Sequence, residues 1–361
     1  MEKDFNKQRK ALIAMSGGVD SSVSAYLMKK QGYDCIGCTM KLYDNEDAGI
    51  SQSKTCCASD DVEDARNVCI KLGIPFYVFN FKEEFREKVI GHFISCYECA
   101  QTPNPCIDCN RYLKFGKLFE RAEILGCDVI VTGHYARIER SGDKYLLKKA
   151  FDPSKDQSYV LYSLTQEQLA HIKFPLSETS KDITRRIAQE NGFINASKPD
   201  SQDICFVPDG DYAKVIEKHT SKIYPPGDFV DKAGNVLGRH KGIIHYTIGQ
   251  RRGLGVPAKE RLFVQKICPE TNTVVLGSNE DLFSAEVNVR DFNWISGEVP
   301  STTFRCHAKI RYRHKEQPAA VTPIDETHVK IIFDEPQRAA TPGQSAVLYD
   351  GDTVLGGGII I

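Results

Sequence analysis

The heptapeptide SGGVDSS, residues 16–22, decides the fold of the first part of the chain. It follows a short apolar run, Lys10 to Met15, and opens the amphipathic stretch Ser21 to Gln31, which Gly32 ends. Two glycines let the backbone turn so that consecutive N–H groups face one anion, and the positive end of the following helix dipole adds to the attraction. The heptapeptide therefore predicts a phosphate-binding loop between a strand and a helix. For a Gly-Gly pair alone, a plain turn would be the better interpretation.

Outward from this loop, short apolar runs alternate with amphipathic stretches as far as residue 135. Strands are expected at 34–40, 76–79 and 128–132, and helices at 60–72, 83–97 and 111–125. This alternation is typical of an α/β doubly wound domain with a parallel sheet.

The pattern of apolar runs and amphipathic stretches changes after residue 135. A hairpin is expected at about 135–148 and helical segments near 166–171 and 182–191, and from Tyr224 onward Gly and Pro punctuate short apolar runs. We predict three domains: a catalytic domain at 1–209, a small central β-rich domain at 210–280 and a C-terminal β-barrel at 281–361.

Composition excludes some classes of protein. The 361 residues carry 47 Lys plus Arg against 48 Asp plus Glu, so the chain is not expected to coat nucleic acid along its whole surface. Neither a leader peptide nor an 18-residue apolar run stands out, so no membrane association is expected. The cysteine count of 13 is odd and ten lie between Cys35 and Cys127, which favours a reducing compartment, the cytoplasm.

The cysteines allow two interpretations. Cys96, Cys99, Cys106 and Cys109 form two C-x2-C pairs, as in a zinc site, but the six-residue gap between the pairs is short. Alternatively, Cys109 alone is reactive, because it precedes a helix expected to begin at Arg111, where the helix dipole and nearby cations would favour a thiolate. Cys205, in KPDSQDICF at 198–206, would by itself be as well explained as a small buried residue.

Basic residues alternate in one stretch of the C-terminal region. Arg305, His307, Lys309, Arg311, Arg313 and Lys315 would all lie on one face of a strand. Neighbouring side chains on such a face are about 6.6 Å apart, a spacing that suits contacts along the phosphates of an RNA backbone. The alternative is a strand face that is merely solvated. Arg251 and Arg252 add a second basic spot.

The phosphate loop contains no Gly-Lys-Ser/Thr, which disfavours a Walker-type loop. It instead resembles the PP-loop of enzymes that split ATP between its α and β phosphates, with Asp20 placed to assist through Mg²⁺. Together with two separated cysteines, this resembles the equipment for replacing an activated oxygen by sulfur.

At this point the whole chain resembles the bacterial tRNA-specific 2-thiouridylase family. The resemblance rests on SGGVDSS, TPNPCIDCN (102–110), TGHYAR (132–137), KDQSY (155–159), the Cys205 loop, GQRRGLG (249–255), RYR (311–313) and TPGQSAV (341–347). It implies an adenine-nucleotide α-hydrolase-like PP-loop domain and ATP-dependent thiolation of the wobble uridine, which gives 2-thiouridine, AMP and pyrophosphate.

The resemblance also implies roles for single residues. Cys109 matches the family nucleophile and Cys205 the persulfide carrier, which a cysteine desulfurase or sulfur relay protein would load; a Cys109–Cys205 disulfide would form in each turnover. The implied ATP-binding positions are Ala14, Met15, Ser16, Gly17, Gly18, Val19, Asp20, Ser21, Met40 and Gly133. The implied tRNA contacts are Asn104, Pro105 and Cys106 at the target base, and His134, Lys155, Asp156, Gln157, Arg311, Tyr312 and Gln344 elsewhere.

One departure concerns Cys106, where many family members have an acid–base Asp. A thiol with an ordinary pKa of about 8.5 does not replace a carboxylate of about 3.9 directly. Cys106 could act as a shifted thiolate, Asp108 could take over, or an iron–sulfur cluster could sit on Cys106, Cys109 and Cys205. Two further alternatives are another PP-loop adenylating enzyme and a metal-bound, non-catalytic RNA-binding module.

Overall fold

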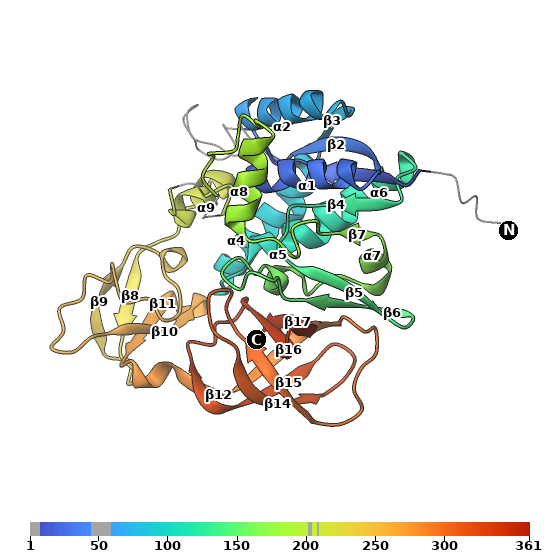
Figure 1. The fold of residues 1–361 in the computed structure, drawn as a ribbon. Coiled ribbons are helices and arrows are strands. Elements are labelled where there is room, and N and C mark those ends of the chain that lie inside the picture. Colours follow the sequence, from blue (N-terminus) through green and yellow to red (C-terminus); the bar gives the residue numbers. More distant parts are fainter. Residues whose placement is uncertain (1–7, 45–58, 201–203, 208) are drawn as a thin grey trace.

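The structure is a computed structural model that describes residues 8–44, 59–200, 204–207 and 209–361 (Figure 1). Five parallel strands form its first sheet, in the order β3-β2-β1-β4-β7. These strands are β1 (Lys10–Ala14), β2 (Asp34–Lys41), β3 (Phe76–Asn80), β4 (Val129–Val131) and β7 (Ile172–Lys173). The strand order reverses between β1 and β4, which is where open α/β sheets bind their ligands.

Side chains of the central strands alternate between two hydrophobic cores. Leu12 faces one core, together with apolar residues of the helical run from Lys82 to Glu98. Ala11 and Ile13 face the other core, with residues of the helices α1 (Val19–Lys30), α2 (Ser59–Leu72) and α8 (Lys181–Glu190). Layers on both faces of a parallel sheet make the doubly wound architecture predicted from the sequence, and that prediction is confirmed.

Two helical runs differ in detail from the sequence prediction. The first comprises α3 (Lys82–Phe85), the π-helical turn η1 (Arg86–Gly91) and α4 (His92–Glu98). The second begins at Pro105, six residues earlier than expected, with α5 (Pro105–Asp108), η2 (Cys109–Lys117) and α6 (Leu118–Ile124). The early start has a local cause: the Asn104 side chain accepts a hydrogen bond from the Cys106 N–H at 3.2 Å, and Pro105 occupies the first helical position.

The central part of the chain forms a four-stranded sheet of order β10-β11-β8-β9. Its strands are β8 (Gly227–Val230), β9 (Val236–His240), β10 (Phe263–Cys268) and β11 (Thr273–Gly277). The preceding helix α9 (Tyr212–Thr220) was not anticipated, and its Ala213 and Ile216 pack into the first hydrophobic core. Short helical turns elsewhere are η3 (Ser158–Leu161), α7 (Gln166–Ala170), η4 (Ile243–His245), η5 (Pro269–Thr271) and η6 (Glu280–Leu282).

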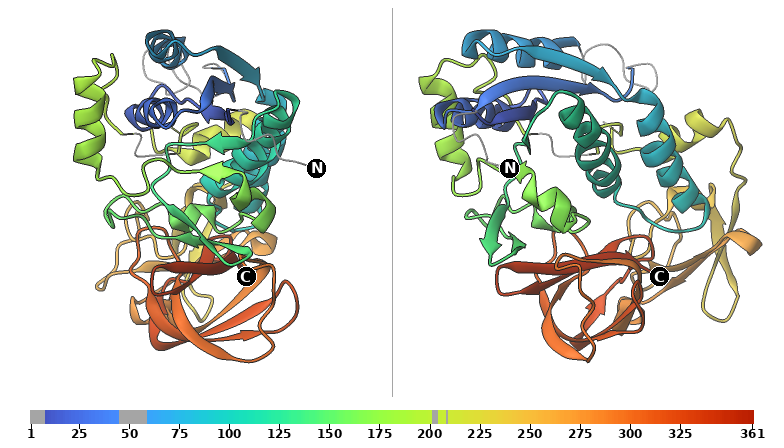
Figure 2. Two further views of the ribbon diagram at one scale, coloured as in Figure 1. Left: turned by 45° about the vertical axis from the view of Figure 1, so that its right-hand side comes forward. Right: turned by 90° about the vertical axis from the view of Figure 1, so that its right-hand side faces the viewer.

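The last six strands close into a barrel, because β12 pairs with β17 as well as with β15. They are β12 (Phe283–Trp294), β13 (Phe304–Lys309), β14 (Gln317–Pro323), β15 (Val329–Arg338), β16 (Ser345–Asp350) and β17 (Thr353–Ile360). Figure 2 shows the barrel at one end of the molecule and α1 and α2 at the other. No helix in the described part of the chain is long and apolar enough to cross a bilayer.

The predicted hairpin β5 (Arg137–Ser141) and β6 (Lys144–Lys148) lies against this barrel (Figure 1). Lys148 of β6 pairs with Thr353 of β17, so the hairpin extends the barrel sheet although it comes from the first half of the chain. Backbone pairing therefore joins the nucleotide domain to the C-terminal barrel.

Candidate functional site

The phosphate loop leaves the carboxyl end of β1 and enters α1. Its first residue after the strand, Met15, is fixed to β2: the Met15 N–H donates to the Cys38 carbonyl at 2.7 Å, and the Thr39 hydroxyl donates to the Met15 carbonyl at 2.8 Å. Gly17 has φ +73°, and a Cβ there would lie 2.4 Å from the Asp61 carbonyl oxygen. Only glycine fits this turn.

Gly133 brings the loop after β4 against the same turn. A Cβ at Gly133 would lie 2.9 Å from the backbone nitrogen of Ser21, in the first turn of α1. Met40 lies on β2, two residues beyond the partner of Ala14 in the strand register. The residues predicted to bind ATP are therefore gathered at the carboxyl edge of β1, β2 and β4, beside the reversal in strand order.

Asp20 is the acidic residue of the loop, and two side chains contact its carboxylate. Lys181 Nζ lies 2.7 Å from Oδ1 and 2.8 Å from Oδ2, and the Tyr135 hydroxyl donates to Oδ1 at 2.8 Å. Lys181 also lies 2.7 Å from Asp200 Oδ1. Burial alone would raise the pKa of Asp200, but hydrogen bonds from Lys155 and Lys181 outweigh it and lower the pKa to about 2.

The segment that leads to Cys205 is attached to the phosphate loop. Asn195 Nδ2 donates to the Gly17 carbonyl at 2.8 Å and to the Ser22 hydroxyl at 2.9 Å. Lys198 Nζ pairs with Asp61 and, at 2.7 Å, with Asp64. Residues 201–203, part of the predicted Cys205 loop, lie outside the described residues.

Cys109 and Cys205 pack against the same hydrophobic core. Both are partly buried, and the Cys205 carbonyl accepts a hydrogen bond from the Tyr43 hydroxyl at 2.7 Å. Asn110, next to Cys109, is buried and donates to the Val160 carbonyl at 2.9 Å, which fixes the Cys109 turn to η3.

The predicted activation of Cys109 by a helix N-terminus is wrong. Cys109 lies inside the helical run that begins at Pro105, not ahead of it. Burial raises the pKa of its thiol to about 11, and Lys114 only partly opposes this effect. Burial likewise raises the pKa of Cys106, although the side chain reaches solvent, so neither thiol is a thiolate at neutral pH in this arrangement.

Asp108, one candidate to replace the family acid–base residue, is engaged elsewhere. Its Oδ2 lies 2.8 Å from His92 Nδ1, and His92 Nε2 lies 3.3 Å from the Cys96 sulfur. Hydrogen bonds to Asp108 and Cys96 raise the pKa of His92 to about 10. Asp108 is therefore half of a partly buried ion pair.

The structure offers no support for a metal on the cysteines. Among the described residues, no three His, Cys, Asp or Glu side chains are grouped so that they could hold a metal ion. Cys106, Cys109 and Cys205 thus do not form the cluster site considered above, and the four-cysteine zinc site does not form either. In this arrangement the described cysteines fit neither an iron–sulfur cluster nor a zinc ion.

The loop predicted to face the target base is held by the barrel. Gln344 Nε2 donates to the Thr102 carbonyl at 2.8 Å, and the Thr102 N–H donates to the Pro342 carbonyl at 2.8 Å. Asn104, Pro105 and Cys106 follow directly. The structure therefore brings Gln344 together with the loop 102–106, which we call the base loop.

The other predicted tRNA contacts differ in how much they face solvent. Asp156 accepts hydrogen bonds from the backbone of Ala150 and Ser158, and Gln157 accepts one from the Tyr135 N–H at 2.9 Å. His134 is only 7% exposed, and its burial, with a smaller contribution from Lys114, holds its pKa well below the usual range. Lys155 is partly exposed, and its Nζ lies 2.9 Å from Asp200 Oδ2.

The six basic residues between 305 and 315 do not form one strand face, and that prediction is wrong. β13 ends at Lys309, and the chain bends at the next residue, Ile310. The Ile310 side chain is buried, with 2% of its surface exposed. The Arg311 guanidinium turns inward and donates to the Ala339 carbonyl at 2.9 Å and to the Thr341 hydroxyl at 2.7 Å. At the other end, Arg305 Nη1 lies 2.7 Å from Asp334 Oδ1.

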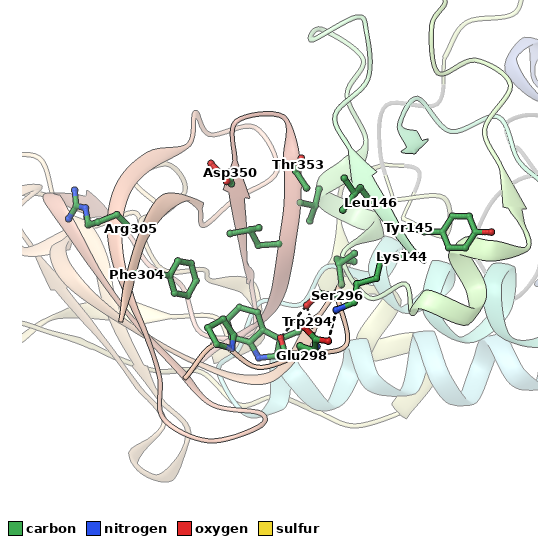
Figure 3. A pocket seen from close by; sticks show the side chains of 14 residues that line it. Lys144, Tyr145, Leu146, Trp294, Ser296, Glu298, Phe304, Arg305, Asp350 and Thr353 are labelled. Carbon is green, nitrogen blue, oxygen red and sulfur yellow. Dashed lines mark hydrogen bonds and ion pairs between the residues drawn. The ribbon is translucent and has the colours of Figure 1, made fainter. Parts of the chain in front are cut away.

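Two cavities lie near these residues. A cleft of about 570 Å³ runs between the start of α9, the loop 245–253 and Arg311, so it opens beside the predicted tRNA contacts. A second cavity of about 320 Å³ lies between β6 and the barrel, lined by Lys144, Trp294 and Phe304 among others (Figure 3). None of the residues predicted to bind ATP, the target base or sulfur lines the second cavity.

Sequence reasoning missed Lys181 and Asn195, which contact the phosphate loop from more than 160 residues away, and Asp200, which pairs with Lys181. One signal was available. Lys181 follows the helix-capping Ser180, and a cation at the first position of a helix opposes the helix dipole, so it needs acidic partners.

Comparison with protein-family models matches three parts of the chain. Residues 9–209 match a tRNA methyl transferase HUP domain, residues 213–278 a tRNA methyl transferase PRC-barrel domain, and residues 284–360 an aminomethyltransferase beta-barrel domain.

Curated proteins match over almost the full length. The tRNA-specific 2-thiouridylase MnmA of Clostridioides difficile (strain 630) is 53% identical over 354 residues, with 98% of each chain covered. The protein of the same name from Acetivibrio thermocellus is 49% identical, covering 98% of this chain and 99% of its own. Among solved structures, a 4-thiouridine synthetase in complex with RNA and ATP is 21% identical, with a TM-score of 0.36, over 59% of this chain and 50% of its own.

Proposed function

Because this chain belongs to the family of tRNA-specific 2-thiouridylases, we propose that it catalyses ATP-dependent 2-thiolation of the wobble uridine in tRNA. One observation carries the proposal beyond family membership: the phosphate loop lies at the reversal of the sheet, in the same domain in which Cys109 and Cys205 pack against one core. A phosphate site and two cysteines packed against one core suit sulfur transfer better than the methyl transfer named in the domain descriptions.

The first half-reaction activates the base. The uridine C2 oxygen attacks the α phosphorus of ATP, a P–O bond forms, and pyrophosphate leaves. The phosphate loop, Ser16 to Ser22, orients the triphosphate through its backbone and the start of α1. Asp20, partly exposed at the loop, could hold the Mg²⁺ that neutralises phosphate charge.

The second half-reaction replaces oxygen by sulfur. The terminal sulfur of a Cys205 persulfide attacks C2, and AMP leaves. The Cys109 sulfur then attacks the Cys205 sulfur, which releases 2-thiouridine and leaves a Cys109–Cys205 disulfide. The Cys109 proton has to leave in this step, and Lys114 is the cation that stabilises the resulting thiolate.

The cycle needs two further reactants. A cysteine desulfurase or a sulfur relay protein loads Cys205, and a two-electron reductant reopens the disulfide. Both requirements support a reducing compartment, so a cytoplasmic location is part of the proposal.

The tRNA is expected to lie across the barrel and the base loop. The loop 102–106, held by Gln344, forms one wall for the flipped uridine, and the cleft at Arg311 lies alongside. Lys155, which is partly exposed, and Tyr312, which is exposed, would contribute further contacts to the tRNA.

The test uses full-length protein, ATP, Mg²⁺, unmodified tRNA and a persulfide donor. We expect 2-thiouridine and AMP in equal amounts, measured by mass spectrometry of digested RNA and by nucleotide chromatography. Cys205→Ser should release pyrophosphate and leave adenylated tRNA without 2-thiouridine or stoichiometric AMP, and Cys268→Ser is the matched control on β10. Absence of 2-thiouridine with the wild-type protein would refute the proposal.

A further inference from the structure

A C-x2-C pair begins at the end of the base loop. Cys106 and Cys109 stand three residues apart, and the Cys109 N–H donates to the carbonyls of both Pro105 and Cys106. The bond to Cys106 is of the 3₁₀ type, in which the side chains of residues i and i+3 lie one above the other. The two thiols therefore lie on the same side of this turn.

The spacing of the pair suits a disulfide. Helix geometry places Cα atoms three residues apart at about 5 Å, inside the range of roughly 4.4–6.8 Å that a disulfide spans. The charges of the two thiols also interact: burial is the main cause of the raised pKa of Cys109, and Cys106 adds to it. Lys114 opposes burial at both thiols, so one cation serves whichever sulfur becomes the thiolate.

The cysteines differ in access to solvent. Cys106 is exposed, whereas Cys109 and Cys205 are partly buried and pack against the first hydrophobic core. A disulfide between Cys109 and Cys205 is therefore harder for a reductant in solution to reach than one that includes Cys106. Access is one of the factors that set the rate of thiol–disulfide exchange.

We propose that Cys106 is the resolving thiol of the sulfur-transfer cycle: it takes Cys109 over from Cys205 and presents the resulting Cys106–Cys109 disulfide to the reductant. The inference rests on the proposed function, in which each turnover leaves a Cys109–Cys205 disulfide. It gives Cys106 a role that the aspartate of many family members could not fill, because a carboxylate forms no bond to sulfur in such an exchange.

The exchange balances without a further oxidant. Cys106 gives up its proton and its sulfur attacks the Cys109 sulfur; the Cys109–Cys205 bond breaks, and the Cys205 sulfur leaves as a thiolate that takes up a proton. The oxidation is moved from one pair to the other. The two-electron reductant, a dithiol, then attacks the exposed Cys106 sulfur, restores both thiols and is itself converted to a disulfide. Cys205 is free for the next persulfide before that reduction takes place.

The test follows disulfides through one turnover of the full-length protein. Cys205 is loaded from a persulfide donor, excess donor is removed, and ATP, Mg²⁺ and excess unmodified tRNA are added without a reductant. Samples are quenched with acid, their free thiols are alkylated, and peptides are mapped by mass spectrometry without reduction. In the wild type we expect a Cys109–Cys205 disulfide at early times and its replacement by Cys106–Cys109, with Cys205 alkylated, at the end.

The decisive variant is Cys106→Ser, which removes the resolving sulfur. Its Cys109–Cys205 disulfide should persist to the end of the reaction, whatever the rate of the first turnover. Cys99→Ser is the matched control, because Cys99 is an exposed thiol of the preceding C-x2-C pair, and it should show the same succession of disulfides as the wild type.

A second measurement examines the pair without sulfur transfer. In the absence of ATP and tRNA, glutathione disulfide should join Cys106 to Cys109 in the wild type and release two glutathione thiols for each bond formed. Glutathione that stays attached to Cys106, with no bond to Cys109, would overturn the inference.

The turnover experiment separates two kinds of failure. If the wild type forms 2-thiouridine but its Cys109–Cys205 disulfide persists, the inference is wrong and the proposed function stands. If no 2-thiouridine forms, the proposed function is refuted, and the inference falls with it.

Discussion

Cys109 shows how much a single residue depends on where its helix begins. In TPNPCIDCN, the Asn104 cap and Pro105 start the helix ahead of Cys106. Cys109 therefore loses the favourable position at a helix N-terminus, and burial keeps its thiol protonated near neutral pH. In the proposed sulfur transfer, the attacking Cys109 thiolate would therefore have to form within the reaction complex.

This arrangement predicts slow alkylation of Cys109. Iodoacetamide should modify it slowly at pH 8 and faster as the pH approaches 11, whereas exposed Cys99 reacts readily at pH 8. Because Lys114 lowers the pKa of Cys109, Lys114→Gln should slow the reaction further, about tenfold for each pKa unit. Peptide mass spectrometry at several pH values measures both rates. Rapid modification at pH 7 that does not depend on Lys114 would contradict the assignment.

At the scale of elements, His92 on α4 joins two helical runs by its ion pair with Asp108 on α5. Its pKa in the folded protein, about 10, lies above the ordinary value of 6.5. A raised pKa stabilises the folded state fully below pH 6.5, and this contribution is lost as the pH rises through 10.

We therefore predict that His92→Gln destabilises the protein most near pH 6. The difference in free energy of unfolding from the wild type should shrink steadily between pH 6.5 and 10. Urea unfolding of both proteins at each pH measures it. A difference that stays constant over this range would show that the ion pair contributes nothing to stability.

β13 and the bend after it determine which basic side chains are exposed and free to contact RNA phosphates. Asp334 already neutralises Arg305, whereas Arg313 is exposed next to Tyr312 and shows no ion pair among the described residues. Arg305→Gln should leave the salt dependence of tRNA binding unchanged, and Arg313→Gln should reduce its slope by about 1. Binding titrations at several salt concentrations measure both slopes. Equal effects of the two variants would favour the continuous basic face.

The sequence was most informative where the signal is local. Strand and helix spacing around SGGVDSS predicted the doubly wound sheet, since β1, α1 and β2 follow one another along the chain. The alternation of basic residues continued beyond Lys309, but periodicity does not show where a strand bends. Lys181 and Asp200 were missed because a contact across 161 residues leaves no periodic trace.

At the scale of the whole molecule, the first half of the chain and the C-terminal barrel are held together around the loop 102–106. The β5–β6 hairpin pairs with β17, and Gln344 holds the base loop, so the barrel fixes the position of residues 102–106 in the nucleotide domain. In the proposed function, a tRNA that contacts the barrel would thereby be presented to the phosphate loop and the cysteines. This arrangement explains how a chain of net charge −1 can serve an RNA substrate with local contacts.

The most direct test of sulfur transfer is a single turnover with labelled sulfur. Cys205 is loaded with a ³⁴S persulfide, excess donor is removed, and ATP, Mg²⁺ and unmodified tRNA are added. We predict that ³⁴S appears in 2-thiouridine at the wobble position, in an amount that does not exceed the loaded Cys205, while a Cys109–Cys205 disulfide forms. Label that stays on the protein while ATP is converted to AMP would contradict the account.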